Sequence, residues 1–130
     1  MSFTPPPDAL TITFPQPAPL LDMNSRQHWA VKAREVAAWR SRAFYAARSV
    51  PAVRRNCGPS FVMLTLPVPD RRRRDPANLF ATAKPVVDGL VDGAIWPDDT
   101  PEWVTTIEPR LVVSRDRVVT VHIWPRGVPS

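Results

Sequence analysis

The chain has 130 residues, a length that suits one domain with a single hydrophobic core. Its hydrophobic content of 44% argues against general disorder, and its net charge of +5 favours an anionic partner, with nucleic acid ahead of a membrane surface. The single cysteine, Cys57, excludes an internal disulfide and a cysteine-based zinc cluster. Neither a signal peptide nor an apolar run of membrane-spanning length is apparent, so we expect a soluble cytoplasmic protein.

We expect one domain over residues 1–130, with flexible proline-rich ends at about 1–8 and 125–130. The first predicted element is an edge strand, "ALTITF" at 9–14, because prolines stand on both sides of it. A helix is predicted from about Ser25 until Pro51 ends it. Its apolar face is read from residues that recur at steps of three and four, namely Trp29, Ala33, Val36, Ala37, Ala43, Phe44 and Ala47. Its outer face is basic, with Arg34, Arg42 and Arg48.

The near-continuous apolar run "FVMLTLPV" at 61–68 is typical of a central strand that is covered on both faces. Two more β-rich runs close the sequence, "WVTTIEPRLVV" and "DRVVTVHIW", and a short turn near Ser114 and Arg115 joins them. We predict that they form an antiparallel hairpin. The order β-α-β-α-β-β predicts an α+β fold, with a mixed sheet of about four strands and two main helices.

The second helix is predicted to begin at Asp75, which is a good N-cap, with Pro76 at the first helical position. At about 100° per residue, one face of this helix is apolar and the opposite face is polar. The apolar face holds Leu79, Ala83, Val86, Val87, Leu90 and Val91, and the polar face holds Asn78, Lys84, Asp88 and Asp92. Gly89 and Gly93 are expected to loosen the C-terminal end of the helix.

Carboxylates gather around this helix, although the chain as a whole is basic. Six of the nine aspartates lie within one stretch, at Asp70, Asp75, Asp88, Asp92, Asp98 and Asp99. One interpretation treats each aspartate locally, as a helix cap, a solvated helix face or a turn. The other is a Mg²⁺ site, because magnesium takes one or two carboxylates and completes its shell with water and phosphate. Lys84, one turn before Asp88, would then orient a carboxylate or meet developing negative charge.

The segment "PDRRRRDPANL", followed by "KPVVDGLVDGAIWPDD", resembles the RusA family of Holliday-junction resolvases, in the style of phage and prophage members. The family pattern has an arginine-rich run, Asp-x-Asp-Asn, a lysine four residues before an aspartate, and an Asp-Asp pair ten residues on. These positions correspond to Asp75, Asn78, Lys84, Asp88 and Asp98-Asp99. The upstream "MNSRQHW" resembles the family's Asn-x-Arg segment, and the resemblance covers about residues 9–124.

The resemblance implies a Mg²⁺-dependent, homodimeric endonuclease that resolves four-way DNA junctions by paired nicks, in DNA recombination and repair. Asp75 and Asp99 would be metal ligands with Asp98 close by, and Asp75, Lys84, Asp88 and Asp99 would form the catalytic set. DNA would be bound by Asn24, Arg26, Asn78 and the run Arg71, Arg72, Arg73 and Arg74. Since extended residues alternate sides, some of these arginines would face phosphates, and those nearest Asp75 would offset its charge.

One position departs from the family pattern. The second aspartate of Asp-x-Asp-Asn corresponds to Ala77, which has no ligating atom. The alternative to a nuclease is therefore a dimer that binds branched DNA and has lost part of the metal site.

Overall fold

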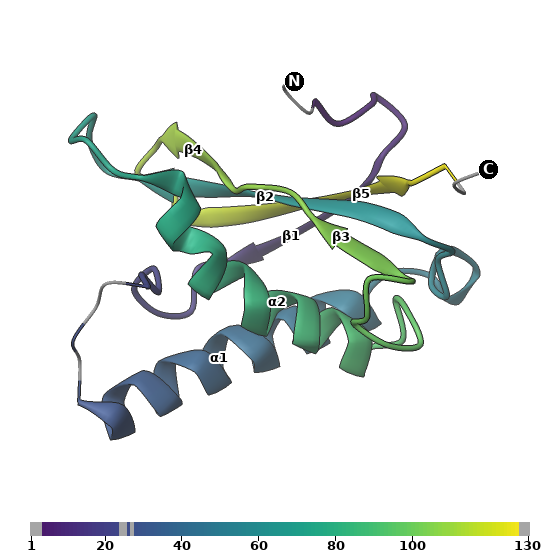
Figure 1. The fold of residues 1–130 in the computed structure, drawn as a ribbon, viewed down its shortest axis with the longest axis horizontal. Helices are drawn as coiled ribbons and strands as arrows, with labels where there is room; N and C mark the ends of the chain where they lie inside the picture. Colours follow the sequence, from purple (N-terminus) through teal and green to yellow (C-terminus); the bar gives the residue numbers. More distant parts are fainter. Residues whose placement is uncertain (1–3, 24–25, 27, 128–130) are drawn as a thin grey trace.

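A mixed β-sheet and two helices make up the fold in a computed structural model that describes residues 4–23, 26 and 28–127 (Figure 1). The strands are β1 (Leu10–Pro15), β2 (Ser60–Val68), β3 (Val104–Thr106), β4 (Arg110–Val113) and β5 (Val118–Pro125). The helices are α1 (Trp29–Arg48) and α2 (Phe80–Asp92), with short 3₁₀ helices η1 (Ala52–Arg54) and η2 (Pro76–Leu79). The predicted α+β class, the mixed sheet and the two main helices are confirmed.

The sheet has five strands, since the predicted strand at 103–113 is divided at 107–109 into β3 and β4. Both pieces pair in parallel with the same edge of β2, β3 at Ser60–Val62 and β4 at Thr65–Val68. Strand β5 pairs antiparallel with the opposite edge of β2, and β1 lies outside β5. The predicted hairpin of the last two strands is therefore wrong, because β2 lies between β4 and β5.

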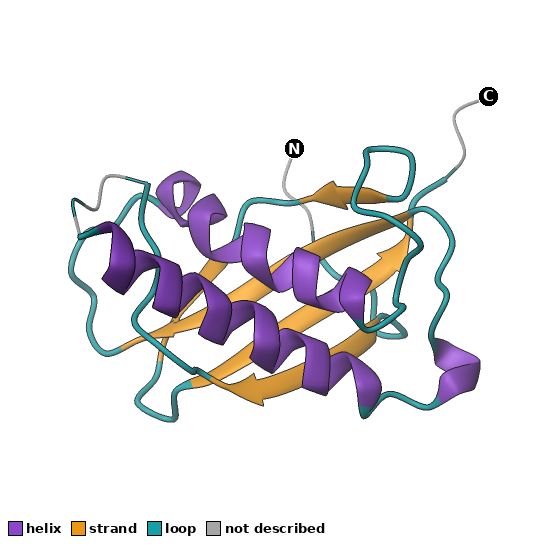
Figure 2. Cartoon of the chain, turned by 90° about the horizontal axis from the view of Figure 1, so that it is seen from below, coloured by secondary structure: helices purple, strands orange, loops and turns teal. Residues whose placement is uncertain are grey.

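Both helices cover one face of the sheet, as the two views at right angles show (Figures 1 and 2). On that face, β2 presents Val62, Leu64 and Leu66, which are fully buried in the core. The alternate residue Met63 points to the other face and is also buried. The prediction that β2 is central is thus confirmed, but the helices cover only one of its faces.

Helix α1 buries a different face in its first half from the one predicted. Trp29, Ala33 and Ala37 are exposed, and Trp39 is fully buried, where its indole N–H donates to the Pro19 carbonyl at 3.1 Å. The helix begins later than predicted, at Trp29, after His28, whose Nδ1 accepts the Ala30 N–H. Its second half agrees with the prediction, since Ala43 and Ala47 are buried. The basic outer face is also confirmed, with Arg34, Arg42 and Arg48 exposed.

Helix α2 follows the predicted pattern closely. Asp75 caps η2 by accepting the Ala77 N–H at 3.0 Å, Pro76 opens η2, and η2 runs directly into α2. The predicted apolar face is buried except for Val91, which is partly buried, and Lys84 and Asp92 on the opposite face are exposed. The helix therefore presents its polar side chains away from the core, where they are available to a ligand.

Thr82 fastens the segment before α1 to α2. Its hydroxyl donates to the Leu21 carbonyl and accepts the Leu21 N–H, both at 2.8 Å, and both residues are buried. Met23 N–H also donates to the Asn78 carbonyl at 3.0 Å. These bonds hold residues 20–23 against the start of α2.

We expect Thr82→Val to lower the free energy of unfolding by about 2 kcal/mol, because it leaves two buried backbone groups of Leu21 without partners. Chemical denaturation of wild type and variant measures the difference. Thr13→Val on the exposed side of β1 is the matched control and should change stability by less than about 0.5 kcal/mol. Equal stability of the two variants would contradict the role given to the Thr82 hydroxyl.

Candidate functional site

Two carboxylates meet at one ammonium group on the polar side of α2. Lys84 Nζ lies 2.8 Å from Asp88 Oδ1, one helical turn along α2, and 2.7 Å from Asp99 Oδ2, in the loop that follows the helix. The side chains of Asp88 and Asp99 are 20% and 35% exposed, whereas that of Lys84 is 64% exposed. The cluster Lys84–Asp88–Asp99 is thus open to solvent from the lysine side.

The loop that carries Asp99 is anchored in the core. Trp96 is buried, and its indole N–H donates to the buried Ser60 hydroxyl at 3.2 Å. Asp98 is exposed, and its Oδ1 accepts the Asp99 N–H at 2.7 Å. Asp98 therefore supports the loop locally, and its neighbour Asp99 is the residue that reaches Lys84.

The contacts within the cluster favour the ionised forms of Lys84 and Asp99. The hydrogen bond from Lys84 is the largest cause that lowers the pKa of Asp99. The bonds to Asp88 and then to Asp99 raise the pKa of Lys84. Asp99 is consequently a carboxylate and Lys84 an ammonium throughout the neutral pH range.

We expect Lys84→Ala to raise the pKa of Asp99 towards the usual aspartate range, since the main cause of its lowering is removed. A lowered pKa means that the contribution of Asp99 to stability is present above the ordinary pKa and is lost as pH falls through the lowered one. Carboxyl ¹³C NMR titration measures the midpoint directly. Asp92 is the internal control, because Arg40 holds its pKa low and Lys84→Ala should leave that midpoint unchanged. An unmoved Asp99 midpoint would contradict this account.

Asp92 belongs to a separate ion pair that the sequence did not suggest. Arg40 of α1 binds it through two bonds, Nε to Oδ2 at 2.7 Å and Nη2 to Oδ1 at 3.0 Å. The pair joins the outer sides of the two helices one turn beyond Asp88. Asp92 is thus paired with Arg40, whereas Asp88 and Asp99 are paired with Lys84.

The arginine run at 71–74 forms a loop that is closed by contacts between Arg74 and Asp70. Arg74 donates to the carbonyls of Asp70 and Arg72 at 3.0 and 2.9 Å and pairs with Asp70 Oδ1 at 3.0 Å. The Asp70 carboxylate also accepts the Arg72 N–H at 2.9 Å, and this bond is the first cause that lowers the Asp70 pKa. The structure therefore pairs the run with Asp70, not with Asp75 as expected. Arg74 is 16% exposed and shapes the loop, whereas Arg71, Arg72 and Arg73 are exposed.

The remaining predicted DNA-binding residues are Asn24, Arg26 and Asn78. Asn78 is partly buried within η2, and its carbonyl holds Met23. Arg26 is exposed, and Asn24 lies outside the described residues. Asp75 and Ala77 are exposed at the beginning of η2. Asp75 is thus placed with the arginine loop, and no hydrogen bond or ion pair of the described residues joins it to the cluster Lys84–Asp88–Asp99.

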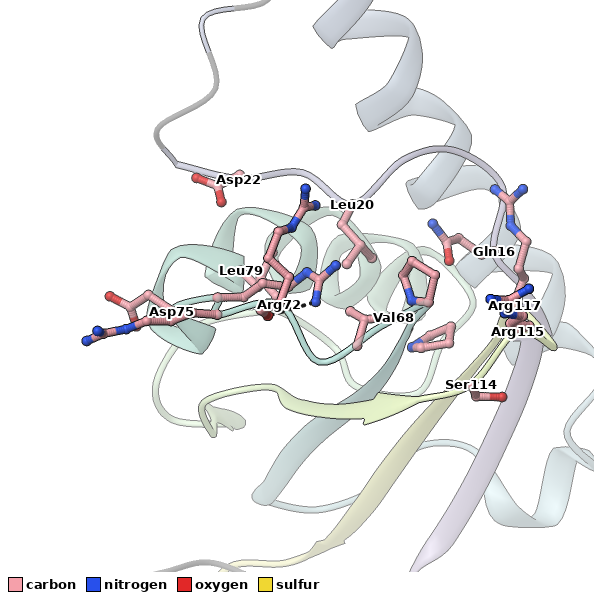
Figure 3. A pocket seen from close by; sticks show the side chains of 14 residues that line it. Gln16, Leu20, Asp22, Val68, Arg72, Asp75, Leu79, Ser114, Arg115 and Arg117 are labelled. Carbon is pink, nitrogen blue, oxygen red and sulfur yellow. Dashed lines mark hydrogen bonds between the residues drawn. The ribbon is translucent and has the colours of Figure 1, made fainter.

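A pocket of about 790 Å³ lies beside Asp75, and we call it the arginine pocket (Figure 3). Arg72 lies on one side, and Arg115 and Arg117, from the turn between β4 and β5, lie on the other. Arg73 and Arg74 also line the pocket. The apolar residues of its lining are Leu20, Pro67, Val68, Pro69 and Leu79, and its other polar residues are Gln16, Asp22 and Ser114. Arg115 and Arg117 could not be predicted as part of this site, because a hairpin of the last two strands would not bring their turn to the arginine run.

No family model matches the chain, and no curated protein matches it. Among residues 4–23, 26 and 28–127, no three His, Cys, Asp or Glu side chains are placed to hold one metal ion. No helix in the same residues is long and apolar enough to cross a membrane. The site must therefore be interpreted from its own chemistry.

Proposed function

We propose that the chain is a Mg²⁺-dependent endonuclease that resolves four-way DNA junctions. The observation that carries the proposal is the convergence of Asp88 and Asp99 on Lys84, on a basic protein whose exposed arginines lie at the start of the same helix. Carboxylates that hold a cation beside a surface for phosphates are the groups that metal-assisted phosphodiester hydrolysis requires. The resemblance to RusA resolvases, on the aspartates, the lysine and the arginine run, supports the same function.

The donor set of the cluster fits magnesium. Asp88 and Asp99 already share one cation, the ammonium of Lys84, and Mg²⁺ commonly takes only one or two protein carboxylates. These two residues would hold the ion, with Asp98 next to them in the loop. Bound there, Mg²⁺ would lower the pKa of a water molecule and stabilise negative charge on the phosphodiester. Asp75, the other predicted ligand, borders the arginine pocket, and its part in metal binding stays a prediction.

The protein side chains have separable roles in this proposal. Asp88 and Asp99 supply the carboxylates, and the hydrogen bond from Lys84 lowers the pKa of Asp99. Lys84 is exposed enough for its ammonium to leave the carboxylates and approach an incoming phosphate without opening the core. The exposed arginines Arg71, Arg72 and Arg73 bind backbone phosphates and orient the strand.

A homodimer acting on branched DNA completes the proposal. Two nicks at symmetric positions require two sites related by a two-fold axis, which a symmetric dimer provides. We place this activity in recombination and repair of DNA in the bacterial cytoplasm, where phage or prophage DNA would also be present.

Ala77 and the position of Asp75 favour a second candidate, a dimer that binds branched DNA without cutting it. Ala77 offers no ligand, and Asp75 lines the neighbouring pocket. In that case binding would survive in EDTA and would be unchanged by Asp99→Asn. Cleavage that appears only in Ala77→Asp would support this candidate.

A synthetic four-way junction with and without Mg²⁺ separates the two functions. At protein concentrations that saturate binding, the nuclease gives paired nicks only with Mg²⁺, seen on a denaturing gel, and prefers the junction to a linear duplex of the same length. No nick at saturation would reject the nuclease and leave the binding dimer. Equal affinity for junction, linear duplex and single strand at matched salt would reject both.

A further inference from the structure

We propose that the arginine pocket holds an unpaired segment of a nucleic-acid strand, with phosphates gripped between the arginine run and the turn that carries Arg115 and Arg117. The inference deepens the proposed function and rests on it for the identity of the ligand as DNA. It assigns a binding role to two arginines that neither the sequence pattern nor the family resemblance singles out.

The topology brings the two sets of arginines together. The chain leaves the sheet after Val68 into the arginine run, and the connection from β4 to β5 passes the same end of β2. Ser114 N–H donates to the Val68 carbonyl at 2.8 Å, and the Arg117 carbonyl accepts the Gln16 N–H at 2.8 Å. The turn is therefore tied to β2 at one end and to the end of β1 at the other.

The turn also has a fixed conformation of its own. The Ser114 hydroxyl accepts the Asp116 N–H at 3.3 Å, and the Asp116 carboxylate accepts the Val118 N–H at 3.1 Å. Arg117 has a φ of 55°, in the left-handed region that glycine or asparagine occupies at lower cost than arginine. The side chain of Arg117 lines the pocket (Figure 3).

The charge and the lining of the pocket select the ligand. Five arginines and only two aspartates, Asp22 and Asp75, line it, so the balance favours an anion. The volume of about 790 Å³ lies in the range of pockets that enclose small molecules, and the apolar lining suits a sugar or a base. A duplex presents mainly phosphates to a protein surface, whereas an unpaired strand offers phosphates and an accessible nucleotide together. The pocket therefore fits an unpaired strand.

The pocket is also well placed for the proposed reaction. Its lining includes Asp75 and Leu79, at the two ends of η2, and Lys84 and Asp88 lie further along, on α2. A strand held in the pocket is thus held at the start of the helix that carries Lys84. Unpaired nucleotides occur where strands exchange at a branch point, which matches the substrate in the proposed function.

The test measures binding of fluorescein-labelled octathymidylate by fluorescence anisotropy over a range of NaCl concentrations. The double variant Arg115→Gln/Arg117→Asn removes two pocket charges, and asparagine tolerates the left-handed conformation at 117. The control Arg48→Gln/Arg54→Gln removes two exposed charges near the opposite end of the molecule. We expect the pocket double to raise Kd about tenfold or more and to reduce the slope of log K against log salt by about 1.4, for two phosphate contacts on a single strand.

The control double loses the same charge as the pocket double. Because Arg48 and Arg54 do not line the pocket, we expect its salt slope to match that of wild type. Equal losses of affinity for octathymidylate in the two double variants, or no loss in either, would overturn the proposal that the arginine pocket binds the strand. An equal loss of affinity for a hairpin duplex would overturn the assignment to an unpaired strand. If the pocket double fails to fold by circular dichroism, Arg72→Gln/Arg73→Gln on the other side of the pocket repeats the test.

The outcome is distinguishable from failure of the nuclease proposal. A wild-type chain that cuts no junction, but whose octathymidylate binding responds to the pocket double alone, supports the pocket and rejects the nuclease. A chain that cuts junctions with Mg²⁺, but whose two doubles bind alike, supports the nuclease and rejects the pocket.

Discussion

Asp99→Asn is expected to lower the rate of Mg²⁺-dependent junction cleavage by about 100-fold or more. A metal-bound carboxylate supports several kcal/mol of transition-state charge stabilisation, and each 1.36 kcal/mol corresponds to a factor of ten. Asp99 is the residue whose ion pair with Lys84 brings the loop after α2 to the helix. Initial rates of nicking, measured with protein and Mg²⁺ in excess over a four-way junction, give the loss.

Asp99→Asn should lower the cleavage rate without lowering the affinity for the junction. The substitution removes one negative charge close to the path of a phosphodiester, so Kd should be unchanged or lower. Thermal stability should also change little, because the side chains of the pair are 64% and 35% exposed, and exposed ion pairs contribute little. A large rate loss with intact binding and folding separates a catalytic role from a structural one.

Asp92→Asn is the matched control, since it removes the same charge one turn beyond Asp88 on the same helix. Asp92 is bound by Arg40 and not by Lys84, so we expect the cleavage rate to stay within a few-fold of wild type. If Asp99→Asn cleaves at the wild-type rate, the metal site lies elsewhere, and Asp75→Asn becomes the deciding variant. Equal losses in Asp99→Asn and Asp92→Asn would indicate a general charge effect.

The buried face of α2 and the cap at Asp75 could be predicted from sequence because the local signals agreed. Asp75 and Pro76 begin the helical segment as predicted, but its first turn is the 3₁₀ helix η2, and α2 itself begins at Phe80. Lys84 and Asp88 are four residues apart, so their contact follows from helix geometry alone. The contact between Lys84 and Asp99 depends on a loop path that periodicity does not encode.

Helix α1 could not be read as well, because alanines lie on more than one side of it. Ala33 and Ala37 continue an apolar stripe from Trp29, yet they are exposed, and the helix rests on Trp39 and Ala43. Both stripes contain a tryptophan: Trp29, at the first residue of the helix, is exposed, whereas Trp39 is buried with its indole N–H bonded to the Pro19 carbonyl. Periodicity predicted the helix, but it did not distinguish which of the two stripes packs against the core.

The arrangement of the last two strands could not be predicted, because β2, from an earlier part of the chain, lies between them. A short turn between two β-rich runs normally predicts a hairpin, but β2 is inserted between β4 and β5. Residues 114–117 can span two inter-strand spacings of about 4.8 Å because an extended chain covers about 3.3 Å per residue. The arginine pocket is a consequence of that insertion, which explains why sequence patterns did not reveal it.

The second large effect is expected from Gly89→Ala, which should lower the free energy of unfolding by about 3 kcal/mol. A Cβ built at Gly89 would lie 2.2 Å from the Arg40 carbonyl oxygen and 2.8 Å from Ala43 Cβ on α1. The first contact is with backbone, so the two helices must separate, and overpacking of this kind exceeds the gain of about 1 kcal/mol in helix propensity. For a chain of this size the melting temperature should fall by about 10 °C, which differential scanning calorimetry measures.

Gly58→Ala is the control, because a Cβ there has nothing within 4 Å and its φ is not positive, so stability should change by less than about 1 kcal/mol.

Gly93, one turn after Gly89, would place a Cβ 2.5 Å from Ala47 Cβ. The two glycines therefore set the distance between α1 and α2. A Gly89→Ala variant that melts with wild type would show that the helices separate at little cost. If it melts lower, the same separation should weaken the bond between Arg40 and Asp92, because that pair spans the contact, and the pKa of Asp92 should rise towards its usual range.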